Sequence, residues 1–104
     1  IKHLFSAIVV VGKEKLRETE TTISCTVTDL SEQVSVTWTG FTAGSNFVPS
    51  EGVYDSETNS QTGTLTVKSG AVTEDSTYTC TITSISNTES ADKSVEVLLN
   101  VYGK

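Results

Sequence analysis

The segment that decides the fold runs from residue 77 to residue 83 and reads Thr77-Tyr78-Thr79-Cys80-Thr81-Ile82-Thr83. Every second residue is threonine, and the residues between them are larger and mostly apolar: Tyr78, Cys80 and Ile82. Successive side chains of a β-strand point to opposite faces of its sheet, so this period of two predicts a strand with one buried and one solvated face.

The same alternation recurs along the rest of the chain. The apolar sets that share one face are Ile23, Cys25 and Val27; Val34, Val36 and Trp38; Leu65 and Val67; and Val95, Val97, Leu99 and Val101. The apolar run from Leu4 to Val11 predicts a first strand; the tail of a signal peptide is the alternative, but no small-residue cleavage site follows. About seven short strands separated by turn residues predict an all-β, two-sheet antiparallel sandwich, with residues 1–104 as a single domain.

Composition and charge exclude some classes of partner. The chain has 7 Lys and Arg against 13 Asp and Glu, a net charge of −6. Nucleic-acid binding requires a basic stripe, and anionic lipid surfaces attract basic residues, so the sequence predicts neither partner. No apolar run approaches the roughly 20 residues that a membrane-spanning helix needs, so we expect no membrane insertion by this segment.

The two cysteines of the chain, Cys25 and Cys80, each lie on the predicted inward face of a separate strand, and Trp38 lies between them in the sequence and also faces inward. Cysteines on facing strands of a sandwich are well placed to form a disulfide between the sheets. Such a bond would close a loop of roughly 55 residues, which the chain-entropy treatment values at about 4 kcal/mol. Disulfides persist in oxidising compartments, so we expect an extracellular location.

At this point the sequence resembles the immunoglobulin superfamily. The matching residues are Cys25, Trp38, Leu65-Thr66-Val67 and Glu74-Asp75-Ser76-Thr77-Tyr78-Thr79-Cys80, similar to the family's L-x-[IV] strand followed by D-x-[GA]-x-Y-x-C. The resemblance covers roughly residues 20 to 101. It implies an immunoglobulin-like sandwich with Trp38, Leu65 and Tyr78 as core residues around the disulfide, and a hydrogen bond from the Tyr78 hydroxyl to the upstream backbone.

Some positions depart from the family pattern. Glu74 stands where the family usually has Asp, Ser76 replaces a smaller residue, and no Arg occurs between Val53 and Thr64. No G-x-G follows Cys80, and the interval from Trp38 to the next matching strand is short. The resemblance is therefore to a constant-like or intermediate set, with at most one extra strand after the third.

The sequence offers little basis for catalysis or metal binding. His3 is the single histidine and has no predicted partner, so we expect no catalytic triad, no zinc site and no cofactor. Carboxylates in the loops at one end of the predicted sandwich could in principle hold Ca²⁺, although their spacing matches no calcium motif and solvated loop charge is the better interpretation. These residues are Asp29, Glu32, Glu89 and Asp92.

A flat and nearly uncharged sheet face is the candidate binding surface. Its predicted members are Thr37, Thr39, Thr79, Thr81 and Leu98, with Phe41 and Phe47 as adjoining aromatic anchors. Each has a plainer interpretation, since threonine suits solvated strands and an aromatic residue is more often part of a core.

The leading hypothesis is an extracellular module that binds another protein, homophilic or heterophilic, in adhesion or receptor–ligand contact. The alternatives are a passive spacer flanked by further domains in a tandem array, a titin-like intracellular domain and a bacterial adhesin domain. The predicted disulfide argues against the intracellular alternative. An enzyme is the least favoured class.

Overall fold

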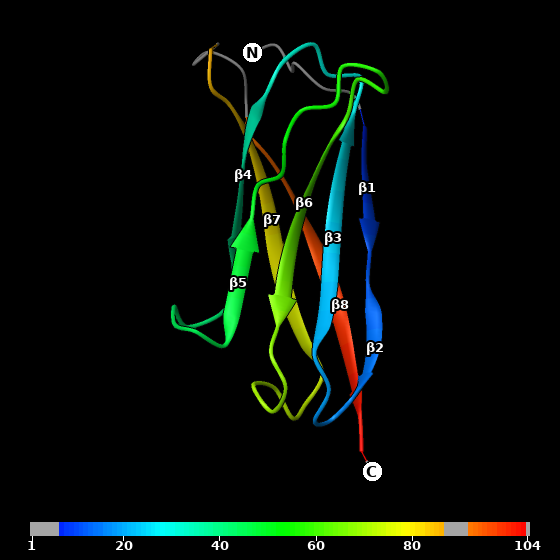
Figure 1. The fold of residues 1–104 in the computed structure, drawn as a ribbon, viewed down its shortest axis with the longest axis vertical. Coiled ribbons are helices and arrows are strands. Elements are labelled where there is room, and N and C mark those ends of the chain that lie inside the picture. The colour runs from blue at the N-terminus through cyan, green and yellow to red at the C-terminus, as the bar shows by residue number, and fades with distance from the viewer. Residues whose placement is uncertain (1–6, 87–91, 104) are drawn as a thin grey trace.

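The computed structural model describes residues 7–86 and 92–103, and strands account for all the regular structure in them (Figure 1). No helix, and so none able to cross a membrane, occurs in these two ranges. The strands are β1 (Ala7–Val11), β2 (Lys13–Leu16), β3 (Thr21–Thr28), β4 (Val34–Thr39), β5 (Phe47–Ser50), β6 (Gln61–Val67), β7 (Ser76–Ser84) and β8 (Lys93–Tyr102).

The strands form two four-stranded sheets. The first sheet has the order β1-β3-β6-β5, and the second has the order β2-β8-β7-β4. The long strands run along the 45 Å axis of the molecule, and β1 begins at the opposite end of this axis from the end of β8 (Figure 1). The predicted all-β, two-sheet sandwich is confirmed.

The predicted first strand, from Leu4 to Val11, ends just before Gly12, and a separate strand, β2, follows this glycine. β1 pairs antiparallel with β3, whereas β2 pairs with β8 and is parallel to it, so the sandwich is not antiparallel throughout. A Cβ atom on Gly12 would lie 2.5 Å from the carbonyl oxygen of Leu98. Glycine therefore permits the close approach at which the chain crosses from one sheet to the other. Residues 4–6 of the predicted strand lie outside the described residues.

Two short strands were not predicted. The Lys-Glu-Lys-Leu sequence of β2 has no apolar alternation, and Pro49 in β5 indicates a turn when the sequence is considered alone. Proline is tolerated in β5 because this strand is at the edge of the first sheet. β5 pairs with β6 and not with β4, so β4 is an edge strand of the second sheet.

The core lies between the sheets and is made by the alternating apolar positions. Val95 and Val101 of the predicted set are only partly buried, at the two ends of β8. The buried apolar residues are Ile23, Cys25, Val27, Leu30, Val34, Val36, Trp38, Leu65, Val67, Tyr78, Cys80, Ile82, Val97 and Leu99.

Lys15 is an exception to this apolar interior. It lies on β2 beside Val101, its residue is 2% exposed, and its Nζ has no hydrogen-bond partner within the described part of the chain. Burial lowers the pKa of the Lys15 ammonium below its ordinary value of 10.5, because an apolar environment penalises the charged form. Lys15 therefore opposes folding at neutral pH.

We expect Lys15→Met to raise the free energy of unfolding at pH 7 by about 1–3 kcal/mol, since methionine fills a similar volume without a buried charge. The unfolded chain keeps the Lys15 proton to a higher pH than the folded chain, so the destabilising contribution of Lys15 should decrease as pH approaches 10.5. The stability difference between the two proteins should therefore shrink over that range. Urea unfolding of both proteins at neutral and alkaline pH measures this difference in the free energy of unfolding. A difference that does not change with pH would contradict the prediction.

Candidate protein-recognition surface

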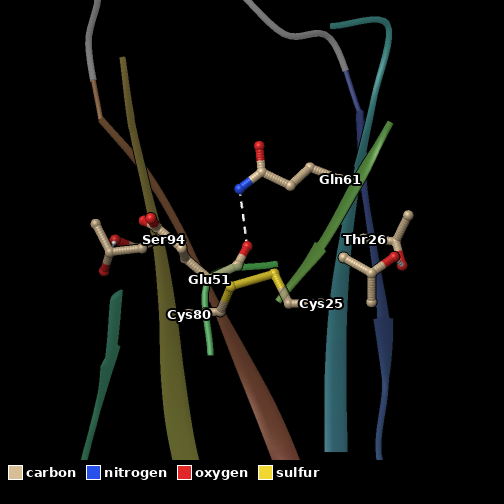
Figure 2. The surroundings of a disulfide bond; sticks show 8 residues. Cys25, Thr26, Glu51, Gln61, Cys80 and Ser94 are labelled. Carbon is tan, nitrogen blue, oxygen red and sulfur yellow. Dashed lines mark hydrogen bonds between the residues drawn. A yellow bond between two sulfur atoms is a disulfide. The ribbon is translucent and has the colours of Figure 1, made fainter. Parts of the chain in front are cut away.

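The predicted disulfide is confirmed and joins the two sheets. Cys25 of β3 and Cys80 of β7 are bonded across the core, with 6.6 Å between their Cα atoms and no solvent exposure of either residue. Figure 2 shows this bond between the sheets, with Thr26 and Ser94 on their opposite outer sides. The bond holds the middle of the first sheet to the middle of the second.

The residues of the core signature surround this bond. Trp38 lies directly opposite Cys80 in the pairing of β4 with β7, and only 5% of its surface is exposed. Leu65 is fully buried on β6, two residues beyond Gly63, which pairs with Cys25. The indole Nε1 of Trp38 is buried and has no hydrogen-bond partner among the residues that the structure describes.

The candidate aromatic anchors lie beside the core. The rings of Phe41 and Phe47 stack with 5.0 Å between centroids, and the Tyr78 ring is 6.4 Å from the first and 6.1 Å from the second. Both phenylalanines are partly buried against the core. Tyr78 contacts them through its aromatic ring. The three rings line an open hollow of about 520 Å³ at the end of the sandwich, so these phenylalanines do not project from the sheet face.

The other candidate residues do come together on the outer face of the second sheet. Thr37 pairs with Thr81 and Thr39 with Thr79 between β4 and β7, while Leu98 of β8 lies opposite another threonine, Thr77. Paired residues in adjacent strands point to the same side, so these side chains form one surface. The Thr81 hydroxyl and the Ser94 hydroxyl are hydrogen-bonded at 2.9 Å within it.

Two further apolar residues extend this surface. Leu16 of β2 is paired with Tyr102 of β8, and Tyr102 shares the outward face of β8 with Leu98. The exposed fractions are 45% for Leu16, 52% for Tyr102 and 47% for Leu98. We call the outward face of the second sheet the recognition face. Its residues are Glu14, Leu16, Ser35, Thr37, Thr39, Thr77, Thr79, Thr81, Thr83, Ser94, Glu96, Leu98, Asn100 and Tyr102.

Comparison with known proteins identifies a family for this chain. A protein family of unknown function, DUF6727, matches residues 10–104. The chain belongs to this family. No curated protein and no solved structure matches the chain. The match covers every strand from β2 to β8, so the whole recognition face of this DUF6727 domain lies inside the family region.

The recognition face of the DUF6727 domain carries little charge. Glu14 and Glu96 are its two ionisable carboxylates, and it holds no Lys, Arg or His. Hydroxyl and amide groups make up most of the remainder. Removing such a surface from water therefore requires less free energy than removing an ion-rich one.

The acidic loop end of the DUF6727 domain does not form a metal site in the described residues. Asp29 and Glu32 lie in the loop between β3 and β4, and Asp92 precedes β8. Across residues 7–86 and 92–103, no group of three or more His, Cys, Asp or Glu side chains is arranged to hold a metal ion. His3 and Glu89 lie outside the described residues.

Proposed function

We propose that this DUF6727 domain is an extracellular module that recognises another protein through the recognition face. The observation that carries the proposal is the combination of an almost uncharged sheet with three large apolar side chains that are about half exposed: Leu16, Leu98 and Tyr102. The cores of protein interfaces are depleted in charged residues and enriched in tyrosine, and the recognition face has a similar composition.

The arrangement of the face supports a central contact with a polar surround. Tyr102 and Leu16 are adjacent through strand pairing, and Leu98 lies four residues before Tyr102 on the same side of β8. Aromatic side chains supply much of the binding energy of an interface when the surrounding contacts exclude water. The threonines of β7 and β4 would form that surround, because they are uncharged and lie on a flat sheet face.

The extracellular location and the immunoglobulin relationship are parts of the same proposal. A disulfide is stable in secreted proteins and is rarely maintained in the reducing cytosol. The buried bond between Cys25 and Cys80, with Trp38 packed opposite Cys80, supports membership of the immunoglobulin superfamily. The two sheets and the short edge strand β5 agree with a constant-like or intermediate set.

We expect Thr79→Lys to reduce binding of a protein partner by about tenfold or more, because the new ammonium would be buried without a counter-charge in the complex. The measurement uses a multimeric form of the domain against an array of secreted and cell-surface ectodomains, followed by titration of each partner found. Thr64→Lys is the matched control, since it places the same charge on the outer face of the first sheet. A partner that binds both variants as well as the unmodified domain would refute the recognition face.

A passive spacer is the second candidate function, and the shape of the molecule favours it. β1 begins at one end of the 45 Å axis and β8 finishes at the other (Figure 1). Domains joined in tandem through these ends would therefore extend in a line. A spacer predicts that the ectodomain array yields no partner, so the same experiment separates the two functions.

A further inference from the structure

The outer edge of β4 presents main-chain groups that pair with no other strand in residues 7–86 and 92–103. β4 pairs on one side with β7 and has no strand on its other side in the described residues. Edge strands of this kind are templates for the addition of another strand. The edge is distinct from the recognition face, because it is directed along the plane of the sheet.

The side chain of Gln61 shows which main-chain groups point to this edge. The Val34 N–H donates to Gln61 Oε1 at 2.9 Å, and Gln61 Nε2 donates to the Val34 carbonyl oxygen at 2.9 Å. A second bond from Gln61 Nε2 to the Glu51 carbonyl oxygen, at 2.8 Å, fixes the side chain in place (Figure 2). Gln61 therefore occupies the position of a neighbouring strand at Val34.

Beyond Val34, the same side of β4 has no partner strand in the part of the chain that the structure describes. Main-chain groups two residues apart along a strand point the same way, so those of Val36 and Trp38 also face the outer edge. Neither residue has a main-chain hydrogen bond there to any residue in the described ranges. The side chains of both residues point into the core, and only 6% of Val36 and 5% of Trp38 is exposed, so an added strand would meet their main-chain groups and not their side chains.

The sequence of β4 has none of the devices that protect sheet edges. Val34–Thr39 contains no charged residue, no proline and no glycine, whereas the edge strand β5 of the first sheet is shorter and contains Pro49. Beyond Val34, where Gln61 occupies the edge, the unprotected main chain at Val36 and Trp38 can accept an extended chain.

The charges around the edge indicate the chemistry of the occupant. From Gln33 to Val67 the chain holds three acidic residues and no Lys, Arg or His. The three are Glu51, Asp55 and Glu57. The loop that carries them is held beside the start of β4, because Gln33 Nε2 donates to the Gly52 carbonyl oxygen at 3.0 Å and Gln33 Oε1 accepts from the Tyr54 N–H at 2.7 Å.

A second copy of this chain fits the edge poorly. Two domains with a net charge of −6 repel each other, and one strand edge buries less surface than stable interfaces do. We propose that the outer edge of β4 is a docking site for an extended, basic segment of a partner protein, which adds a strand to the second sheet by pairing with the main chain of Val36 and Trp38. The inference rests on the proposed function only in that the partner is a protein.

The test uses a short synthetic peptide in which Thr and Val alternate between terminal lysines, with a second peptide in which glutamates replace those lysines. The lysine peptide is expected to slow hydrogen exchange of the Val36 and Trp38 amides by about tenfold or more, because strand addition protects these groups. The glutamate peptide is expected to bind at least about tenfold more weakly, since it is repelled by the acidic loop.

Two modified domains localise the effect. N-methylation of Val36 by semisynthesis removes the outer donor and obstructs the edge while keeping the side chain, so it should abolish peptide binding. Leu98→Ala changes the recognition face on β8 without adding a charge and should leave peptide binding intact, which distinguishes failure of the edge from failure of the face. Trp38 emission checks that both fold. Absence of peptide binding, equal binding of the two peptides, or protection of Val36 that grows with domain concentration alone would overturn the proposal.

Discussion

Replacing both Cys25 and Cys80 with alanine is expected to lower the free energy of unfolding by about 2–5 kcal/mol. The bond joins residues 55 apart in the sequence, so its loss greatly enlarges the set of conformations open to the unfolded chain. Domains of this size have a total stability of about 5–15 kcal/mol, so a large fraction of the molecules could unfold at 37 °C. Urea unfolding followed by Trp38 emission measures the change directly, because the indole is packed opposite Cys80.

The control for this prediction is the unmodified protein after reduction. Reduction also opens the loop but keeps both sulfur atoms in the core, so its stability should fall close to that of the double alanine variant. A double variant that loses less than about 1 kcal/mol would show that the interface between the sheets, and not the disulfide, holds the sandwich together.

The buried face of each long strand could be predicted from the sequence because side-chain period alone determines it. Ile23 and Val27 flank Cys25 on β3 just as Tyr78 and Ile82 flank Cys80 on β7, and all of them are buried. The disulfide followed from the same argument, since two cysteines on inward faces of facing sheets are within bonding reach.

The short strands could not be predicted, since pairing and not pattern determines them. β2 is held as a strand by β8, although its inward residue is Lys15. The hydrogen bonds of the Gln61 side chain to the main chain of Val34 could not be predicted either. Nothing in the sequence around Gln61 indicates that its side chain crosses to the other sheet.

The recognition face could be predicted in part. The outward threonines followed from alternation, and Tyr102 could have been found by extending the outward series of β8 beyond Asn100. Leu16 could not, because its place beside Tyr102 depends on the crossing at Gly12. Phe41 lies in a loop and Phe47 begins the short strand β5, so neither belongs to an alternating pattern in the sequence. Only the structure shows that their rings lie against Tyr78.

Gln61→Leu is expected to lower the free energy of unfolding by about 2–4 kcal/mol, although leucine is apolar and similar in size. Gln61 is 1% exposed and makes three hydrogen bonds, which satisfy the N–H and the carbonyl of Val34 and the carbonyl of Glu51. Leucine would leave these groups without partners in a place that water reaches poorly, and an unsatisfied buried group costs about 1–3 kcal/mol. Thermal and urea unfolding measure the loss.

Gln33→Leu is the matched control for this substitution. Gln33 also bonds two main-chain groups of the loop after β5, but it lies at a partly exposed position where water can replace those bonds. Its substitution should therefore lower stability by less than about 1 kcal/mol.

Gln61→Glu tests the oxygen and the nitrogen of the amide separately. The carboxylate can still accept a hydrogen bond from the Val34 N–H, but it cannot donate one and would face two carbonyl oxygens. It should be at least as damaging as leucine, and equal stability of all three variants would show that Gln61 does not replace a strand at the edge of β4.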